Sequence, residues 1–521
     1  MRKQSSMTIE DVQSYHLSPC HPNSAGIDIG SRENYVAISP EKATELGIPI
    51  VKIFGTTTSE LNDCAEYLVS CGVTDVAMES TGIYWKNLHR ILILHGIAAE
   101  VVNPRHFKMV PGRKTDVSDC QWLQTLHYYG LLSGSFIPDD STQQLRSLVR
   151  FRQKLLHEIA TQVNRIQKNL VCMNVMLVNV VSDVTGKTGM GIIRAILDGH
   201  RDSKFLASLR DRRCKKSEEE IAEALNGSWR DDFLFLLRTA VETYDFLQGQ
   251  LCSLDKSILA ALDSIPDGDA IVVEDGIVKD RNTWEPLGPL PSDLDLSHAC
   301  IEVDKIVDSV NGEILWIRPA KQEAEEGEGD SGTEGKKKAK TRSRTKNEFT
   351  CDCDLAEVIN KKAGVPICDL DGFGPLTSLC MLSEVGFNLE RFPDAKHFAA
   401  YLGLVPRNKI TGGVIISSRT DRIKHPGSIA LKTIVPSLSR MDCPLASFFH
   451  SKKASSGTGK AITATARKLA ENYYNCITYG DAYIKKGEAL AKQASDTKKR
   501  QRLEKLAKQL NVTISPNVLS A

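Results

Sequence analysis

The chain has 521 residues, 41% hydrophobic and 25% charged, which is ordinary for a globular protein and too long for a single core. No run of about 18 apolar residues occurs and the N-terminus lacks an apolar stretch, so neither a membrane helix nor a signal peptide is expected. Fourteen cysteines occur without a Cys-x-x-Cys pair, which predicts reduced thiols in a cytoplasmic protein rather than a zinc site.

The net charge of +1 conceals a strong asymmetry. Residues 266–335 hold 18 acidic and 5 basic residues, a net charge of −13, whereas residues 391–440 carry +7 and residues 441–510 carry +8. A basic C-terminal part suits a polyanion such as nucleic acid, although a merely solvated surface has the same composition.

The first part of the chain has the pattern of a mixed α/β domain. Apolar, β-rich segments predict strands at residues 26–30, 33–39, 51–56, 75–80 and 98–103. Amphipathic segments predict helices at residues 58–71, with Ser59 as N-cap, and at 84–96 and 115–129. This order of elements matches the ribonuclease H-like fold.

The middle of the chain is predicted to be helical. Two long helices are predicted, at residues 141–171 with apolar residues seven and four apart and at 233–262 with apolar residues three and four apart. The second is a coiled-coil pattern, and the two helices could pack within the chain or on a partner chain. The segment between them, at about 180–230, is predicted to be helical with basic turns. Residues 266–355 are an insertion with a β-hairpin, a further strand and a charge-segregated run expected to be disordered.

The C-terminal part returns to a globular pattern after residue 355. Gly372 and Gly374 form a turn that feeds a helix and resembles half a helix-hairpin-helix that contacts phosphate, although this motif alone favours an ordinary glycine turn. Another helix is predicted at residues 395–404, followed by a loop at 406–427. Further helices are predicted up to Lys432, at 462–480 and at 485–509.

Four carboxylates stand where these elements would bring them together: Asp28, Glu79, Asp116 and Asp119. The first two lie on short apolar strands, and the others are three apart at the start of a helix and therefore share one face. Carboxylates on rigid elements are the ligands that Mg²⁺ or Mn²⁺ prefers, and such ions support phosphodiester chemistry. Asp116 alone is equally explained as a charge that favours a helix N-terminus.

Several segments resemble the DEDD-type insertion-sequence transposases, the family that includes the pilin-gene inverting recombinase. They are AGIDIG, MESTGIYW, VNPRHFKMVPGRKTDVSDCQWL, GLLSGSFIP, LDGFGPLTSLCMLSEVG and RFPDAKHFAAYLGLVP. The resemblance covers roughly residues 25–265 and 356–475, and places the family's four acids on the same four carboxylates. It implies a RuvC-like (RNase H-like) N-terminal domain, a helical coiled-coil region and a mainly α C-terminal domain.

With this resemblance, the chain is expected to divide into six parts. They are a flexible leader at 1–22, a DEDD domain at 23–135, a helical coiled-coil region at 136–265, an acidic insertion with a small β element and a disordered linker at 266–355, a C-terminal transposase domain at 356–450, and a basic helical tail at 451–521.

The resemblance also implies a serine nucleophile after the Gly-Leu-x-Pro motif. In this sequence the position is Thr411, whose hydroxyl can act as a nucleophile although its β-methyl crowds the approach. Ser417 and Ser418 are the nearest alternatives. Candidate DNA contacts besides the two glycines are Arg113, Lys114, Arg407 and Arg419.

The expected function is a transposase or site-specific recombinase that cleaves and joins DNA strands. Its partners would be the element ends and target DNA, further copies of itself as a dimer or tetramer and, as in some family members, an RNA encoded in the element. Two alternatives stay open: a branched-DNA nuclease without strand joining, and an inactive remnant that only binds nucleic acid.

Overall fold

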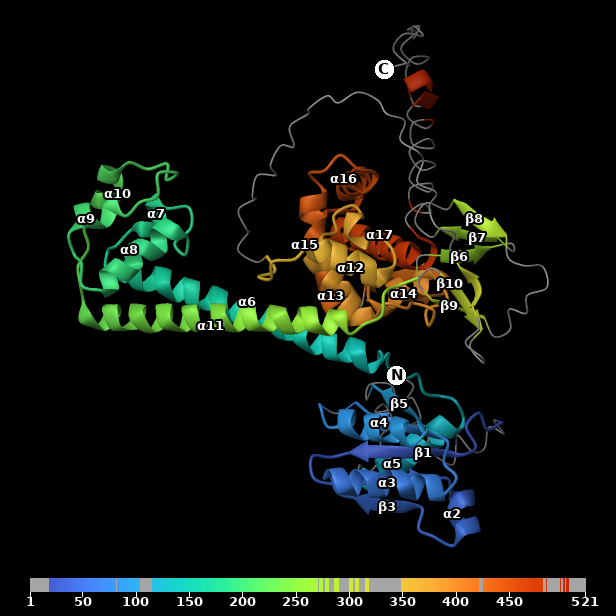
Figure 1. The fold of residues 1–521 in the computed structure, drawn as a ribbon. Coiled ribbons are helices and arrows are strands. Elements are labelled where there is room, and N and C mark those ends of the chain that lie inside the picture. The colour runs from blue at the N-terminus through green and yellow to red at the C-terminus, as the bar shows by residue number, and fades with distance from the viewer. Residues whose placement is uncertain are drawn as a thin grey trace. The chain divides into compact units, whose positions relative to one another are not determined.

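A computed structural model shows two compact units, residues 1–137 and 138–521, which are described separately (Figure 1). The structure describes residues 18–80, 82–103, 115–269, 271–274, 277–280, 285–289, 299–302, 305–308, 314–317, 348–420 and 425–480, with a few single residues between 484 and 505.

The first unit is built on a five-stranded mixed sheet in the order β3-β2-β1-β4-β5. The strands are β1 (Ser24–Ile29), β2 (Asn34–Ile38), β3 (Val51–Phe54), β4 (Asp75–Glu79) and β5 (Ala98–Val102). β1, β2 and β3 pair antiparallel as a meander, whereas β4 and β5 continue the sheet parallel to β1. The mixed α/β domain predicted from the sequence is confirmed.

Among the described residues of this unit, four helices accompany the sheet: α2 (Pro40–Leu46), α3 (Thr58–Ser70), α4 (Trp85–Leu94) and α5 (Asp116–Tyr128). Helix α2 was not predicted because its seven residues are too few to show a helical period, although Ser39 caps it and Pro40 begins it. The N-cap predicted for α3 was wrong by two positions. Thr57, not Ser59, accepts from the amide of Glu60, whose carboxylate completes a capping box.

Helix α5 lies unusually close to strand β1 because Gly26 has no side chain. A Cβ at Gly26 would stand 2.3 Å from the backbone nitrogen of Gln124 and 2.4 Å from the carbonyl oxygen of Cys120. Both atoms belong to α5, whose buried residues Cys120 and Leu123 face the sheet. The glycine therefore fixes how closely the middle of α5 approaches β1.

Replacing Gly26 by Ala is expected to destabilise the protein by about 1–3 kcal/mol, because backbone atoms of α5 must move away from the sheet. The measurement is thermal or urea unfolding of the full chain. Gly191→Ala on α8 is the matched control, since a Cβ there meets nothing within 4 Å. Equal stability of the two variants would contradict the close packing.

The second unit contains two 33-residue helices, α6 (Asp140–Cys172) and α11 (Asp231–Asp263), that pack along each other within the chain (Figure 1). A buried ion pair joins them: the Arg152 Nε lies 2.6 Å from the Asp255 Oδ1. The Asp255 Oδ2 also accepts from the amide and hydroxyl of Thr350, at 2.8 and 2.9 Å. The carboxylate thus fixes the register of the two helices and holds the chain that returns after the insertion.

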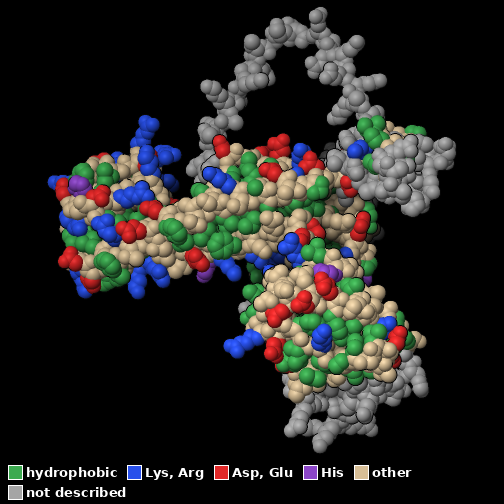
Figure 2. Space-filling view, turned by 60° about the horizontal axis from the view of Figure 1, so that its bottom comes forward, with side chains coloured by type: hydrophobic (Ala, Val, Ile, Leu, Met, Phe, Trp, Pro, Cys, Tyr) green, Lys and Arg blue, Asp and Glu red, His purple; other side chains and the backbone are tan. Residues whose placement is uncertain are grey.

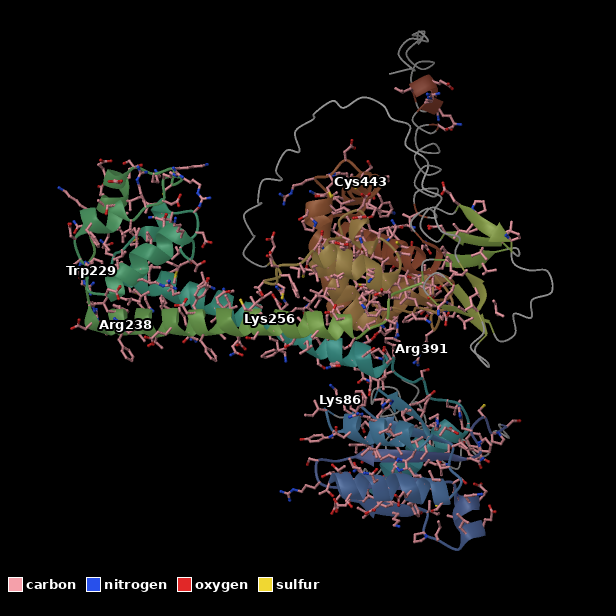
Figure 3. All side chains as sticks on the ribbon, in the orientation of Figure 1. Lys86, Trp229, Arg238, Lys256, Arg391 and Cys443 are labelled. Carbon is pink, nitrogen blue, oxygen red and sulfur yellow. The ribbon has the colours of Figure 1, made fainter. Side chains whose placement is uncertain are left out.

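Four short helices lie at the far end of this pair: α7 (Leu177–Val180), α8 (Lys187–Leu197), α9 (Ser203–Ser208) and α10 (Glu218–Ala224). Arg238 on α11 donates to the carbonyl of Leu197 at the end of α8 (Figure 3). The Arg201 guanidinium lies 4.9 Å from the ring centroid of Trp229. These contacts, around a shared apolar core, anchor the four helices to α11.

The insertion carries more β-structure than predicted. The expected hairpin is present as β6 (Ile271–Glu274) and β7 (Ile277–Asp280), and the expected strand as β11 (Ile314–Ile317). The structure adds β8 (Pro286–Pro289), β9 (Ala299–Glu302) and β10 (Lys305–Asp308), which complete two three-stranded sheets. The predicted disordered run lies outside the described residues.

The C-terminal part is mostly helical, as predicted. Its elements are α12 (Leu355–Ala363), η3 (Ile367–Asp369), α13 (Pro375–Val385), α14 (Ala395–Tyr401), α15 (Pro426–Leu438), α16 (Pro444–Ser456) and α17 (Thr458–Tyr479). The predicted loop at 406–427 was wrong, because it contains the hairpin β12 (Pro406–Thr411) and β13 (Val414–Thr420). Most of the helix predicted at 485–509 lies outside the described residues.

A buried carboxylate ties this part to α6. Glu384 on α13 is 1% exposed and accepts two hydrogen bonds from Arg150, both at 2.7 Å. Arg146, one turn earlier on α6, donates to the backbone carbonyl of Ser383 at 3.1 Å. Such a bidentate pair holds α13 in one orientation on α6.

None of the helices in the described part of the chain is both long and apolar enough to cross a membrane. The cysteines whose side chains the structure describes are free thiols.

Candidate active site

The four predicted carboxylates line one cavity in the first unit. Asp28 lies near the end of β1, and Glu79 ends the parallel neighbour β4, whose Met78 pairs with Ile27. Asp116 and Asp119 lie in the first turn of α5, which packs on β1. The cavity has a volume of about 610 Å³ and is lined by Asp28, Ile29, Gly30, Ser31, Arg32, Glu33, Tyr35, Glu79, Asp116 and Asp119.

The start of α5 is held firmly where the two aspartates stand. Thr115 caps the helix by accepting from the amide of Ser118 at 3.2 Å, and the Ser118 hydroxyl accepts from the Thr115 amide at 3.1 Å. This reciprocal capping fixes the first turn. The i, i+3 spacing then directs both carboxylates to the same side of α5.

The negative charge of this cavity raises the pKa of neighbouring groups. Tyr35, the cross-strand partner of Asp28, has a raised pKa, first because its hydroxyl bonds to Glu33 and further because of the charges on Asp116 and Asp28. Burial and then the nearby Asp28 carboxylate raise the pKa of Cys120 to about 12. The cavity therefore favours a cation.

The donor set fits a divalent metal ion. All four groups are carboxylates, which are hard oxygen ligands, and they project from two strands and a capped helix that hold them in place. Glu79 is only 4% exposed, so its carboxylate lies at the shielded inner side of the cavity. These residues fit Mg²⁺ or Mn²⁺.

Thr411, the predicted nucleophile position, lies at the tip of the β12–β13 hairpin in the second unit. It pairs with Val414 across Gly412 and Gly413, whose φ values of 56° and 80° define a two-residue turn of type I′. Its side chain is exposed. Among the described residues, none forms a hydrogen bond with the Thr411 hydroxyl, which is thus accessible to an incoming phosphate.

The same hairpin brings together two of the predicted DNA contacts and both alternative hydroxyls. Arg407 and Arg419 are direct cross-strand partners and both are exposed. Ser417 pairs with Lys409 and Ser418 with Asn408, which lie two and three strand positions before Thr411. The hairpin therefore presents two neighbouring arginines at its surface.

The remaining predicted contacts are placed separately. Gly372 has a φ of 79° in the turn before α13, and a Cβ there would stand 2.6 Å from the Leu438 Cδ1. Gly374 is the N-cap of α13, and a Cβ there would meet nothing within 4 Å. Gly372 is therefore needed for close packing against Leu438, whereas the space beside Gly374 at the N-terminus of α13 is unfilled. Arg113 and Lys114 lie outside the described residues.

A second basic surface covers the α7–α10 end of the second unit. Lysine and arginine side chains gather over these helices (Figure 2). Exposed members of the group are Lys204, Arg212, Arg213, Lys215 and Lys216. Part of this charge is balanced, because Arg213 pairs with Asp211 and Lys216 with Glu220. Even so, the surface extends the basic character beyond the C-terminal part.

Sequence reasoning missed the other side chains that line the carboxylate cavity. Arg32, Glu33 and Tyr35 come from the turn between β1 and β2 and from β2 itself. Their place follows from the hairpin register, in which Tyr35 opposes Asp28. Pairing the two predicted strands around the turn at Gly30 and Ser31 would have placed Tyr35 opposite Asp28.

Two protein-family models match the chain. Residues 25–174 match the DEDD transposase model of the IS110 group, and residues 366–441 match the transposase IS116/IS110/IS902 family. No curated protein matches it.

The cavity of acids and the two matches define the class as transposases, enzymes that act on DNA. The two matched segments, residues 25–174 and 366–441, support the resemblance to the IS110 family of DEDD transposases that the sequence implied.

Proposed function

We propose that this transposase is a metal-dependent recombinase that cleaves and joins DNA strands at the ends of its insertion sequence. The observation that carries the proposal is the convergence of Asp28, Glu79, Asp116 and Asp119 on one cavity. The sheet order supports a ribonuclease H-like, RuvC-like domain, because the antiparallel meander is continued by two parallel strands. The packed pair α6 and α11 fits the proposed coiled-coil region.

The four carboxylates would hold the divalent ions. Such ions, when bound, neutralise charge on the scissile phosphate and on the attacking and leaving oxygens. The protein's own contribution is to fix the ligands: Gly26 seats α5 on β1, and the Thr115 cap sets its first turn. Because the ligands are held in place, the positioning of the reacting groups would supply much of the enhancement of the reaction rate.

Thr411 would provide the attacking hydroxyl. Its hydroxyl gives up its proton as the oxygen bonds to the phosphorus, and the strand oxygen leaves and takes up a proton. The DNA becomes linked through a phosphothreonyl ester. The reverse reaction, with a new strand end as nucleophile, joins strands without an outside energy source. The exposed position at a hairpin tip, between arginine-bearing strands, suits this role.

Incubating the purified chain with element-end DNA tests the proposal against the alternatives. A recombinase yields joined products with Mg²⁺ and none with a chelator. A branched-DNA nuclease yields nicked product without joining, and a remnant that only binds yields no cleavage. Either of the last two outcomes contradicts the proposal.

Removing the hairpin arginines is expected to weaken DNA binding in a salt-dependent way. Arg407→Ala and Arg419→Ala should each lower affinity across sequences and reduce the slope of log affinity against log salt by about 0.9 per lost phosphate contact. Binding isotherms over a range of salt measure this. Lys256→Ala, which removes an exposed charge on α11, is the control (Figure 3). Slopes equal to wild type would exclude the hairpin as a phosphate contact.

Assembly and RNA binding complete the proposal. We expect a dimer or tetramer, since two element ends must be processed together. An element-encoded RNA would have the basic surface of α7–α10 available to it. Size measurements with and without element-derived RNA test both expectations.

A further inference from the structure

A second cluster of metal-ligating side chains lies at the other end of the first unit's core elements. Its members are His21, before β1; Asp75, the first residue of β4; and His127, in the last turn of α5. Glu79 and Asp116 stand at the opposite ends of the same strand and helix. Eleven residues of helix separate Asp116 from His127, about 16 Å along the axis. The cluster is therefore distinct from the carboxylate cavity.

Three potential ligand atoms converge on this point. The His21 Nδ1 and the His127 Nε2 each lie 2.9 Å from the same oxygen, Asp75 Oδ1. The two imidazole rings stack with centroids 4.4 Å apart at 14°. Each of the three residues offers an atom within 4.8 Å of the others, the spread expected around one bound ion.

The closest atoms of the cluster lack well-aligned hydrogen bonds. The His127 Nε2 and the Asp75 Oδ1 form an ion-pair contact at 2.9 Å, but within the described residues neither buried atom has a hydrogen-bond partner of good geometry. The His127 side chain is 2% exposed. Buried polar atoms are nearly always satisfied, and a bound ion is one way to satisfy them.

The surroundings keep the ligands oriented. The Thr74 hydroxyl donates to the Asp75 Oδ2 at 2.8 Å, which leaves Oδ1 directed at the histidines. The amide of His21 donates to the Tyr128 carbonyl at 3.0 Å and fixes the segment before β1.

We propose that His21, Asp75 and His127 form a binding site for Zn²⁺ or a similar first-row transition ion. Two imidazoles and one carboxylate are a ligand set that zinc accepts, with a further position left for water. The ion would join the segment before β1, the start of β4 and the end of α5. Its role is structural: it would clamp the end of α5 opposite the catalytic carboxylates.

Cobalt titration of the full chain in excess Mg²⁺ tests this site. Magnesium occupies carboxylate sites but competes poorly for imidazole, so visible absorption bands and metal content report the histidine cluster. Wild type is expected to bind one Co²⁺ per chain, displaced by Zn²⁺, and to gain thermal stability. His21→Gln, at a partly exposed position, and His127→Gln should each weaken binding by more than about 10-fold.

His157→Gln, at an exposed histidine on α6, is the matched control and should bind like wild type. Circular dichroism verifies that the variants are folded, and His21→Gln keeps the test valid if His127→Gln fails to fold. The proposal is overturned if wild type binds no stoichiometric Co²⁺, or if His21→Gln binds it as tightly as wild type.

Discussion

Replacing Asp116 by Ala is expected to lower DNA strand cleavage and joining by more than about 100-fold, because the change removes a direct ligand of the catalytic ions and even indirect ligand contacts are worth 10–100-fold. Asp116 is exposed at the start of α5, where its loss leaves no buried group unpaired. The folded structure should therefore survive. Rates of strand exchange on element-end DNA, measured at several Mg²⁺ and Mn²⁺ concentrations, provide the measurement.

Glu33→Gln is the control for this substitution, since Glu33 is exposed and lines the same cavity without belonging to the four assigned acids. It should retain activity. If the Asp116→Ala protein recombines DNA at the wild-type rate, the assignment of Asp116 as a metal ligand is contradicted. An equal loss in both variants would point to the general charge of the cavity rather than to the assigned ligands.

Replacing Thr411 by Val is expected to abolish the covalent protein–DNA intermediate, a loss on the order of 10⁴-fold or more in strand transfer. Valine keeps the β-branched shape that suits the end of β12 but lacks the hydroxyl. Thr411→Ser is the informative counterpart, because it keeps the hydroxyl and removes the methyl group that crowds it. The serine variant should react at least as fast as wild type.

The nearby serines are controlled separately. A double Ser417→Ala, Ser418→Ala variant should keep its activity, because these residues pair with Lys409 and Asn408 away from the hairpin tip. If the double variant is inactive and Thr411→Val is not, the nucleophile is one of the serines.

The sequence predicted the first unit well because its core elements carry strong periodic patterns. Strands such as β1 and β4 place apolar residues on both faces, and α3 and α4 each bury one face, so their positions follow from hydrophobicity. The four acids converge because two end neighbouring strands and two begin the helix packed on them. Their common cavity was predictable from element order alone.

The β12–β13 hairpin was not predictable from the same patterns. Arg407, Ile410 and Ile416 are all exposed, so neither strand shows the alternation of a half-buried sheet. The Gly412–Gly413 pair was a usable turn indication, since two glycines between β-prone residues favour a type I′ turn.

The histidine cluster also escaped sequence reasoning. Its three residues are 54 and 52 positions apart, so no metal-binding spacing appears in the chain. They meet only because the segment before β1 pairs its amides with the Tyr128 carbonyl at the end of α5. Only the three-dimensional register of β4 and α5 reveals the site.

The most direct test of the proposed chemistry is to trap the covalent intermediate on element-end DNA with Mg²⁺ and to identify the linked peptide by mass spectrometry. The expected result is DNA attached to the peptide containing Thr411 in the wild-type protein, and no attachment in the Thr411→Val and Asp116→Ala proteins. Cleavage without any protein–DNA linkage, or a linkage to another residue, would contradict the assignment of Thr411 as the nucleophile.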